Sequence, residues 1–261
     1  MKTPEWEARV ERANELINDF PASAQLLRFY ARLAAFQRGI YDAVSRWDTL
    51  DAERPLRSQI EAGLLVPFFP ELLTISQEHG PAKLAEAAKR CYEAGETGWR
   101  EAILDYVAGV EPEDASHLFF VRACVEPYAE HLASRLPIPD AITGICPLCA
   151  ARPGLAVLRP EGEGAKKSLV CSFCLVEWEF RRILCPVCGE ESDPHLPVFT
   201  AQEFPYFRVE GCDTCKHYLL SVDLSKNGRA LPLVDEIAAA PLDFWARQQG
   251  FEKIAPNLLG V

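Results

Sequence analysis

Apolar residues in the first half of the chain recur every three or four positions. The longest stripe comprises Leu26, Phe29, Leu33, Phe36, Ile40, Val44 and Trp47. This spacing predicts one long amphipathic helix that begins near Pro21. Residues 81–95, 97–109 and 114–136 repeat the pattern, and glycines close the first two. We therefore expect a bundle of six or seven helices, the last of them bent at Pro127.

The period of the apolar positions changes from about 3.6 to two in the second half. Alternating apolar and polar residues predict strands in LVEWEFRRIL (175–184) and HYLLSVDL (217–224). Asn227-Gly228 follows the second of these and favours a tight type I′ turn, which needs positive φ at both positions. PLDFWARQQG (241–250) predicts one short C-terminal helix. Between the halves, LPIPDAITGI (136–145) has no helical period and is the expected linker.

Composition narrows the possible partners. The 261 residues carry 27 Lys and Arg against 38 Asp and Glu, a net charge of −11. This balance argues against nucleic-acid binding, because affinity for nucleic acid comes from neutralising phosphates with basic side chains. The N-terminus lacks the apolar region of an export signal, and the apolar run 64–73 is too short to span a bilayer. We predict a cytoplasmic protein without membrane insertion.

Ten cysteines in a reducing compartment indicate metal or redox chemistry rather than a disulfide framework. Eight of them form four Cys-x-x-Cys pairs: Cys146 and Cys149, Cys171 and Cys174, Cys185 and Cys188, Cys212 and Cys215. A two-residue gap lets a tight turn point both sulfurs at one ion about 2.3 Å away. Two such turns complete a tetrahedron, so the pattern predicts two metal sites of four thiolates each.

Loop lengths favour sequential pairing of the four turns. Twenty-one residues separate Cys149 from Cys171, and twenty-three separate Cys188 from Cys212. These similar, hairpin-sized loops place the first two pairs in one site and the last two in another. The interleaved alternative would join the first pair to the third. Gly189 can take the positive φ that often follows the second cysteine, whereas Ala150 stands at that position in the first turn.

Several other residues and motifs are better explained as ordinary structural features than as functional ones. Cys91 and Cys124 lie in helical segments without a partner at the right spacing, so we expect buried apolar side chains. His217 and His195 are weaker candidate ligands, because each site already has four sulfurs. EGEGAKKS (161–168) is an acidic loop rather than a phosphate-binding one. No catalytic arrangement of nucleophile and base can be recognised, so the prediction is that the chain is not an enzyme.

Closed four-thiolate sites mostly stabilise folds, yet tetrahedral sulfur suits either zinc or iron. The function classes left open are a metal-containing binding factor, a redox protein whose sites cycle, and a zinc-ribbon nucleic-acid binder, which the charge disfavours. A disulfide-exchange enzyme fits less well, since such enzymes use one poised pair of thiols.

The flanks of the cysteine pairs make the chain recognisable. A helical half followed by CPLC, CSFCLVEWEFRRILCPVCGE, YFRVEGCDTCKHYLLSVDL and KIAPNLLGV resembles the FdhE family of formate dehydrogenase accessory proteins. The resemblance covers essentially the whole chain. Family members usually have a glycine where Ala150 stands, a departure that concerns the geometry of the first turn.

The resemblance implies a cytoplasmic accessory factor that binds the immature catalytic subunit of formate dehydrogenase and is needed for its maturation. It implies rubredoxin-like modules with iron as the metal, zinc being the alternative. The eight implied ligands are the eight paired cysteines named above. We thus predict an α+β protein with a helical domain (1–138), a first four-cysteine module (139–182), and a second module with a C-terminal helix (183–261).

Overall fold

The computed structural model describes residues 6–47, 50–110 and 114–260. Helices fill the first half: α1 (Trp6–Asp19), α2 (Ala24–Val44), α3 (Ala62–Leu65), α4 (Phe69–His79), α5 (Ala82–Ala108) and α6 (Ala115–Ser134). Short 3₁₀ turns lie between some of them, one at Leu56–Gln59. Among all the residues that the structure describes, none of the helices combines the length and the apolar character that a membrane span needs.

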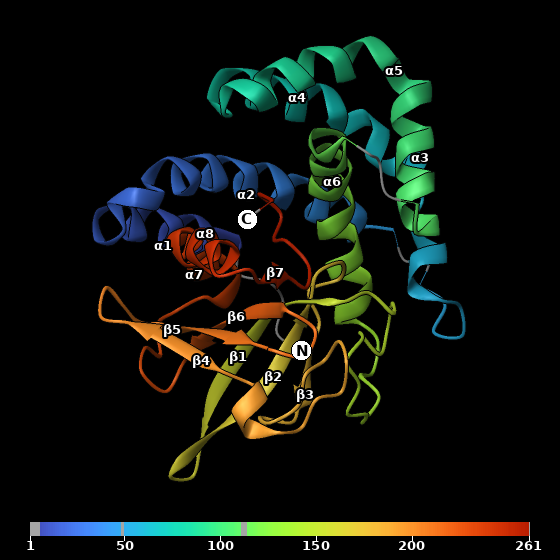
Figure 1. The fold of residues 1–261 in the computed structure, drawn as a ribbon. Coiled ribbons are helices and arrows are strands. Elements are labelled where there is room, and N and C mark those ends of the chain that lie inside the picture. Colours follow the sequence, from blue (N-terminus) through green and yellow to red (C-terminus); the bar gives the residue numbers. More distant parts are fainter. Residues whose placement is uncertain (1–5, 48–49, 111–113, 261) are drawn as a thin grey trace.

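The second half forms a sheet followed by two helices. Its strands are β1 (Pro153–Glu161), β2 (Gly164–Cys171), β3 (Glu177–Phe180), β4 (Val198–Ala201), β5 (Phe204–Gly211), β6 (His217–Asp223) and β7 (Glu252–Lys253). The helices α7 (Pro232–Ala238) and α8 (Ala240–Gln248) lie between β6 and β7 in the sequence. The predicted α+β class is confirmed, with helices first and the cysteine-rich sheet after them (Figure 1).

The sheet consists of two similar antiparallel ribbons joined side by side. Its strand order is β3-β2-β1-β6-β5-β4, with β7 beside β6. Within each ribbon the neighbours are antiparallel, whereas β1 and β6 pair in parallel, with Leu155 opposite Leu220. β1 and β6 each begin shortly after a Cys-x-x-Cys turn, so this pairing brings both cysteine groups to the same end of the sheet.

Helices cover one face of the sheet and connect it to the N-terminal half. α7 contacts β1 and β6, and α8 contacts β5 and β6. α1 packs on α2 and α7, while α4 and much of α5 lie farther from the sheet (Figure 1). The main hydrophobic core extends from α2 through α6 to the four cysteines of the first group. The helical half and the sheet therefore share one core, and the boundaries at 138 and 182 stay a prediction.

Local structure departs from the sequence pattern in three places. α2 ends at Val44, and Trp47 is 56% exposed because the stripe outlasts the helix. The C-terminal region holds two helices rather than one, since PLVDEIA also forms a helix, α7. Neither Asn227 nor Gly228 has positive φ, so the predicted type I′ turn is wrong. The chain turns there through bonds from the amides of Lys226 and Asn227 to the carbonyl of Asp223, and it then enters α7.

Two other expectations on the helical half are confirmed. Hydrogen bonds run along the whole of α5, residues 82–108. Gly95 inside it has φ 62° and ψ −172°, so the helical backbone is broken at that residue. The predicted helices on either side of Gly95 therefore meet at a kink. Cys91 and Cys124 are buried, 5% and 0% exposed, as expected of apolar side chains.

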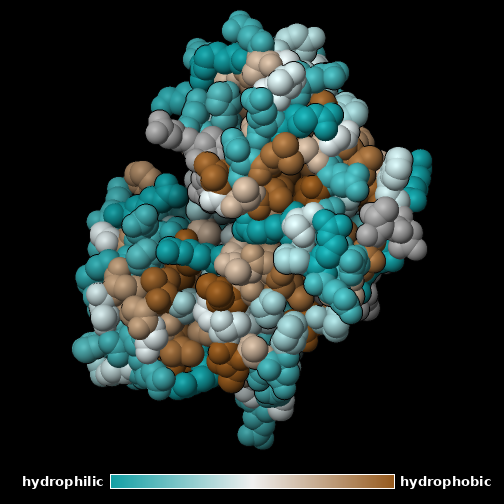
Figure 2. Space-filling model, turned by 90° about the vertical axis from the view of Figure 1, so that its right-hand side faces the viewer, coloured by the Kyte–Doolittle hydropathy of each residue, from teal (hydrophilic) through white to brown (hydrophobic). Residues whose placement is uncertain are grey.

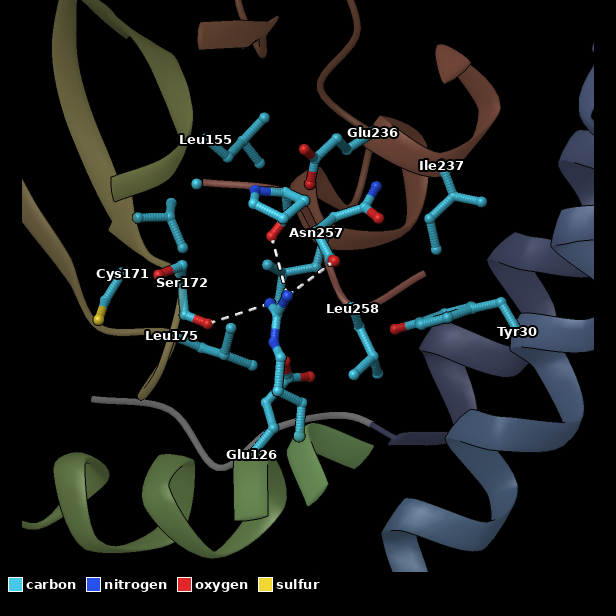
Figure 3. Close-up of a pocket in the computed structure, with 15 residues that line it drawn as sticks. Tyr30, Glu126, Leu155, Cys171, Ser172, Leu175, Glu236, Ile237, Asn257 and Leu258 are labelled. Carbon is cyan, nitrogen blue, oxygen red and sulfur yellow. Dashed lines mark hydrogen bonds between the residues drawn. The ribbon is translucent and has the colours of Figure 1, made fainter. Parts of the chain in front are cut away.

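Charged side chains are buried where α1, α6, α7 and the sheet meet. Arg9 pairs with Glu130, and Arg12 with Asp235 at 2.6 Å. Glu126 and Glu236 line a cavity of about 40 Å³ in the same region (Figure 3). Burial raises the pKa of each of these two carboxyls to about 7. Both carboxyls are thus harder to ionise in the folded protein than in the unfolded chain.

We expect Glu126→Gln to stabilise the protein at pH 8 and to change little at pH 4. The folded pKa of about 7 lies above the ordinary value of 4.5, although Arg122 and Arg9 partly offset the burial. The carboxyl's contribution is therefore fully present below pH 4.5 and is lost as pH rises through 7. The gain at pH 8 should be on the order of 3 kcal/mol, because the pKa differs by about 2.5 units between the two states. Urea unfolding at both pH values measures it.

Glu86→Gln is the matched control, because Glu86 is an exposed carboxylate on α5. Its free energy of unfolding should stay within about 0.5 kcal/mol of the parent at both pH values. Equal stability of Glu126→Gln and the parent at pH 8 would show that Glu126 is ionised in the fold at little cost.

Candidate metal centres

The structure gathers the paired cysteines into two groups of four. Site one comprises Cys146, Cys149, Cys171 and Cys174; site two comprises Cys185, Cys188, Cys212 and Cys215. Within each group the sulfurs lie within 4.8 Å of one another. This is the sequential grouping, not the interleaved one.

The sulfur spacing fits a tetrahedral metal ion. Sulfurs from opposite turns approach to 3.3 and 3.6 Å in site one and to 3.6 and 3.7 Å in site two. Four sulfurs at 2.3 Å from a central ion would lie about 3.8 Å apart. A disulfide would need about 2.05 Å, so the contacts are too long for that bond. Either iron or zinc suits such a shell.

All four Cys-x-x-Cys turns have the same backbone. In each turn, the first cysteine's N–H donates to the carbonyl five residues later, at 2.8–2.9 Å. The residue directly after the second cysteine has positive φ in every case. These residues are Ala150 (59°), Leu175 (58°), Gly189 (77°) and Lys216 (59°). We call each such turn a knuckle; its form aims both sulfurs to one side.

Three knuckles therefore hold a side chain in a conformation that glycine adopts more easily. The left-handed region costs an L-residue roughly 1 kcal/mol. Because added chain entropy in the unfolded state offsets part of the gain, Ala150→Gly should stabilise the protein by about 0.5 kcal/mol. Chemical denaturation of the metal-loaded protein measures it. Ala151→Gly is the control and should destabilise, since Ala151 has no positive φ. If Ala150→Gly proves less stable than the parent, the left-handed conformation of Ala150 does not strain the backbone.

Site one is buried, and side chains from the helical half form hydrogen bonds with its two knuckles. Its four cysteines are 0–7% exposed and belong to the main core. Arg57, in the 3₁₀ turn before α3, donates to the carbonyl of Cys149 at 3.2 Å and lies 3.9 Å over the ring of Phe173. Arg122 of α6 donates to the carbonyl of Ser172 at 3.3 Å (Figure 3). An arginine from the helical half thus contacts each knuckle of site one.

Site two lies nearer the surface and its contacts come from loops. Cys188 is exposed and Cys215 partly exposed. Glu190 joins the two knuckles of this site, since its carboxylate accepts from the Thr214 hydroxyl at 2.6 Å. That bond, together with the Ser192 N–H and His195, lowers the pKa of Glu190 to about 2. Gly144 of the linker packs against the carbonyl oxygen of Pro186, a contact that leaves no space for a Cβ.

Crowding of the thiols shifts their proton affinities when no ion is bound. Hydrogen bonds from Cys149, Cys171 and Cys174 lower the pKa of Cys146. Burial raises the pKa of Cys171, and hydrogen bonding to Cys146 raises that of Cys174. In site one, the Cys146 thiolate is thus stabilised by its neighbours' protons. A bound cation would replace those protons as the shared partner.

The structure places the weaker candidates outside both sulfur groups. His217 bonds the carbonyl of Cys215 through Nδ1, and His195 lies beside Glu190. The acidic loop at 161–164 forms the tip of the β1–β2 hairpin. Ligation by the eight cysteines stays a prediction that the sulfur geometry supports.

Sequence reasoning missed the residues that support the knuckles. Arg57, Arg122 and Glu190 lie 92, 50 and 24 residues from the groups that they contact. Local spacing carries no signal for such pairs. Leu175 and Lys216 could have been found, because each follows the second cysteine of a pair, as Gly189 does.

Known proteins resemble both the sequence and the fold. Residues 183–259 match the family described as FdhE, C-terminal domain. The "Protein FdhE homolog" of Aquifex aeolicus is 26% identical over 275 residues, which cover 99% of this chain and 96% of the relative. That of Pseudomonas aeruginosa is also 26% identical, with 96% and 88% covered. The crystal structure of the FdhE protein from Pseudomonas aeruginosa has the same fold, with TM-score 0.70, 24% identity, and 100% and 98% coverage.

Proposed function

Because the chain belongs to the FdhE family, we propose that it is a cytoplasmic accessory protein for formate dehydrogenase maturation. It binds the immature catalytic subunit, is needed for that subunit to become active, and is not itself an enzyme. The observation that carries this proposal is the pair of four-sulfur groups within a chain that aligns with FdhE homologues almost from end to end.

Each sulfur group holds one metal ion, with Cys146, Cys149, Cys171 and Cys174 around the first and Cys185, Cys188, Cys212 and Cys215 around the second. Iron is our first choice and zinc the alternative. The ions cross-link segments that are distant in sequence, and so they keep the end of the sheet rigid. A rigid surface suits a binding factor, because less entropy is lost when it docks.

Exposed apolar side chains beside the knuckles suit the docking surface. Ile142 and Ile145 of the linker are 57% and 47% exposed, and Ile183, before Cys185, is 47% exposed. Figure 2 shows that apolar residues gather in patches on one face of the molecule. Such patches on a soluble protein commonly mark a contact with another protein. In this proposal, the catalytic subunit binds to the surface around Ile142, Ile145 and Ile183.

Removal of the chain from a cell that makes formate dehydrogenase tests the requirement. The catalytic subunit should still be synthesised, as immunoblotting would show, but formate oxidation should fall by at least tenfold. Expression of the intact chain should restore activity. Purified chain alone should oxidise no formate. Full dehydrogenase activity without the chain would overturn the proposal.

A redox role is the second candidate, and the exposure of Cys188 favours it because an electron donor could approach that side of site two. If iron cycles at this site, reduced and oxidised protein should bind the catalytic subunit with different affinities. Equal binding of both forms in a pull-down experiment would count against this role.

A further inference from the structure

The two sulfur groups have the same backbone but very different surroundings. Every sulfur-bearing side chain of site one is buried within the main core. In site two, Cys188 is exposed and Cys215 partly so, while Cys185 and Cys212 are buried. A competing ligand from solvent can therefore approach site two at Cys188, whereas site one must first open.

The contacts that hold the knuckles in place also differ between the sites: those of site one come from the helical half, and that of site two lies at the surface. Opening site one requires the bonds from Arg57 and Arg122 to break, and the contact of Tyr106 with Phe173, at 5.4 Å between rings, to be lost. Opening site two requires the loss of the Thr214 bond to Glu190, a bond at the surface between an exposed threonine and a partly exposed glutamate. A solvent-exposed hydrogen bond has water as a ready replacement, so its loss costs less than the loss of a buried one.

We propose that site two is a ligand-exchange site, whose ion can be taken over by a thiolate from outside, and that site one holds its ion as a permanent part of the fold. This inference rests on the proposed loading of each site with one ion. The ligand class is a soft sulfur donor. Cys188 is the residue at which exchange begins, because it is the one exposed residue among the eight paired cysteines.

The exchange is a substitution without electron transfer. The Cys188 thiolate leaves the ion, and a thiolate of the incoming ligand takes its place. The proton that the incoming thiol loses ends on the released Cys188 sulfur. Cys215, which is partly exposed and faces Cys185 across the site at 3.7 Å, follows as the next sulfur to leave.

The test uses the full chain loaded with Zn²⁺ and an excess of a small dithiol, 2,3-dimercaptopropane-1-sulfonate. Native mass spectrometry counts the zinc ions left on the protein over time. We expect two phases of one ion each, the first at least tenfold faster than the second. Cys188→Ser should eliminate the fast phase and leave the slow phase unchanged.

Thr214→Val provides a variant that keeps all eight sulfurs. It removes the hydroxyl that joins the knuckles of site two while it preserves the shape of the side chain, so the fast phase should accelerate severalfold. Thr200→Val, at an exposed position of β4 in the same ribbon, is the matched control and should change neither phase.

Release of both ions at one rate, or loss of the slow phase in Cys188→Ser, would overturn the assignment while the two-ion proposal stands. A parent protein that binds fewer than two zinc ions would overturn the two-ion proposal as well. Acceleration of the slow phase by Thr214→Val would also contradict the assignment, because Thr214 lies at site two.

Discussion

Cys171→Ser is expected to lose the ion of site one and to unfold most of the molecule. Cys171 is 1% exposed and belongs to the core that the helical half shares with the sheet. Metal binding to a structural four-thiolate site contributes roughly 10–16 kcal/mol of apparent free energy at pH 7. Whole domains are stable by only about 5–15 kcal/mol. The variant should thus lose about 5 kcal/mol or more, measured by calorimetry and by metal analysis.

Cys188→Ser is the matched comparison, since it removes one sulfur from the other site. Cys188 is exposed and lies outside the shared core, so this variant should lose one ion yet keep its far-ultraviolet circular dichroism and most of its melting temperature. If Cys171→Ser melts within a few degrees of the parent, site one is not the structural centre that its burial indicates.

Lys253→Met is expected to destabilise the protein by about 3–5 kcal/mol at pH 8, because it leaves buried carboxylates without their cation. Lys253 bonds Glu236 at 2.7 Å and Asp243 at 2.9 Å, and all three side chains are at most 4% exposed. The pKa of Glu236 is already raised to about 7 by burial. Without Lys253 that pKa rises further, so the destabilisation should be smaller at pH 5, where the carboxyl is protonated.

Urea unfolding at pH 5 and pH 8 measures both effects. Lys226→Met is the control, because Lys226 is exposed, and it should change the free energy of unfolding by less than about 0.5 kcal/mol. Combination of Lys253→Met with Glu236→Gln should recover part of the loss at pH 8. A loss that is equal at both pH values would show that packing of the lysine stem matters more than its charge.

The fold class and the membership of each sulfur group followed from local pattern. The helical stripe of α2 and the alternation of β6 depend on side-chain period, which residue order displays directly. The grouping of the cysteines followed from loop length, because short hairpins bring only adjacent pairs together.

What could not be predicted depends on contacts between distant segments. The parallel pairing of β1 with β6 joins the two ribbons, and residues 155–158 carry no mark of it. The helix α7 has Asp235 and Glu236 on buried positions, so its sequence looks less apolar than its surroundings. Arg12 and Lys253, from opposite ends of the chain, neutralise those acids. Burial of paired charges is decided by the partner, which local pattern does not show.

Affinity capture of the tagged chain from anaerobically grown cells, with mass spectrometry of the proteins that follow it, tests the accessory role most directly. Cys185→Ser/Cys188→Ser serves beside it as a folded variant without the ion of site two. We predict that the intact chain recovers a formate dehydrogenase catalytic subunit and that the variant recovers much less. Absence of that subunit from the intact capture, in cells where it is synthesised, would contradict the account.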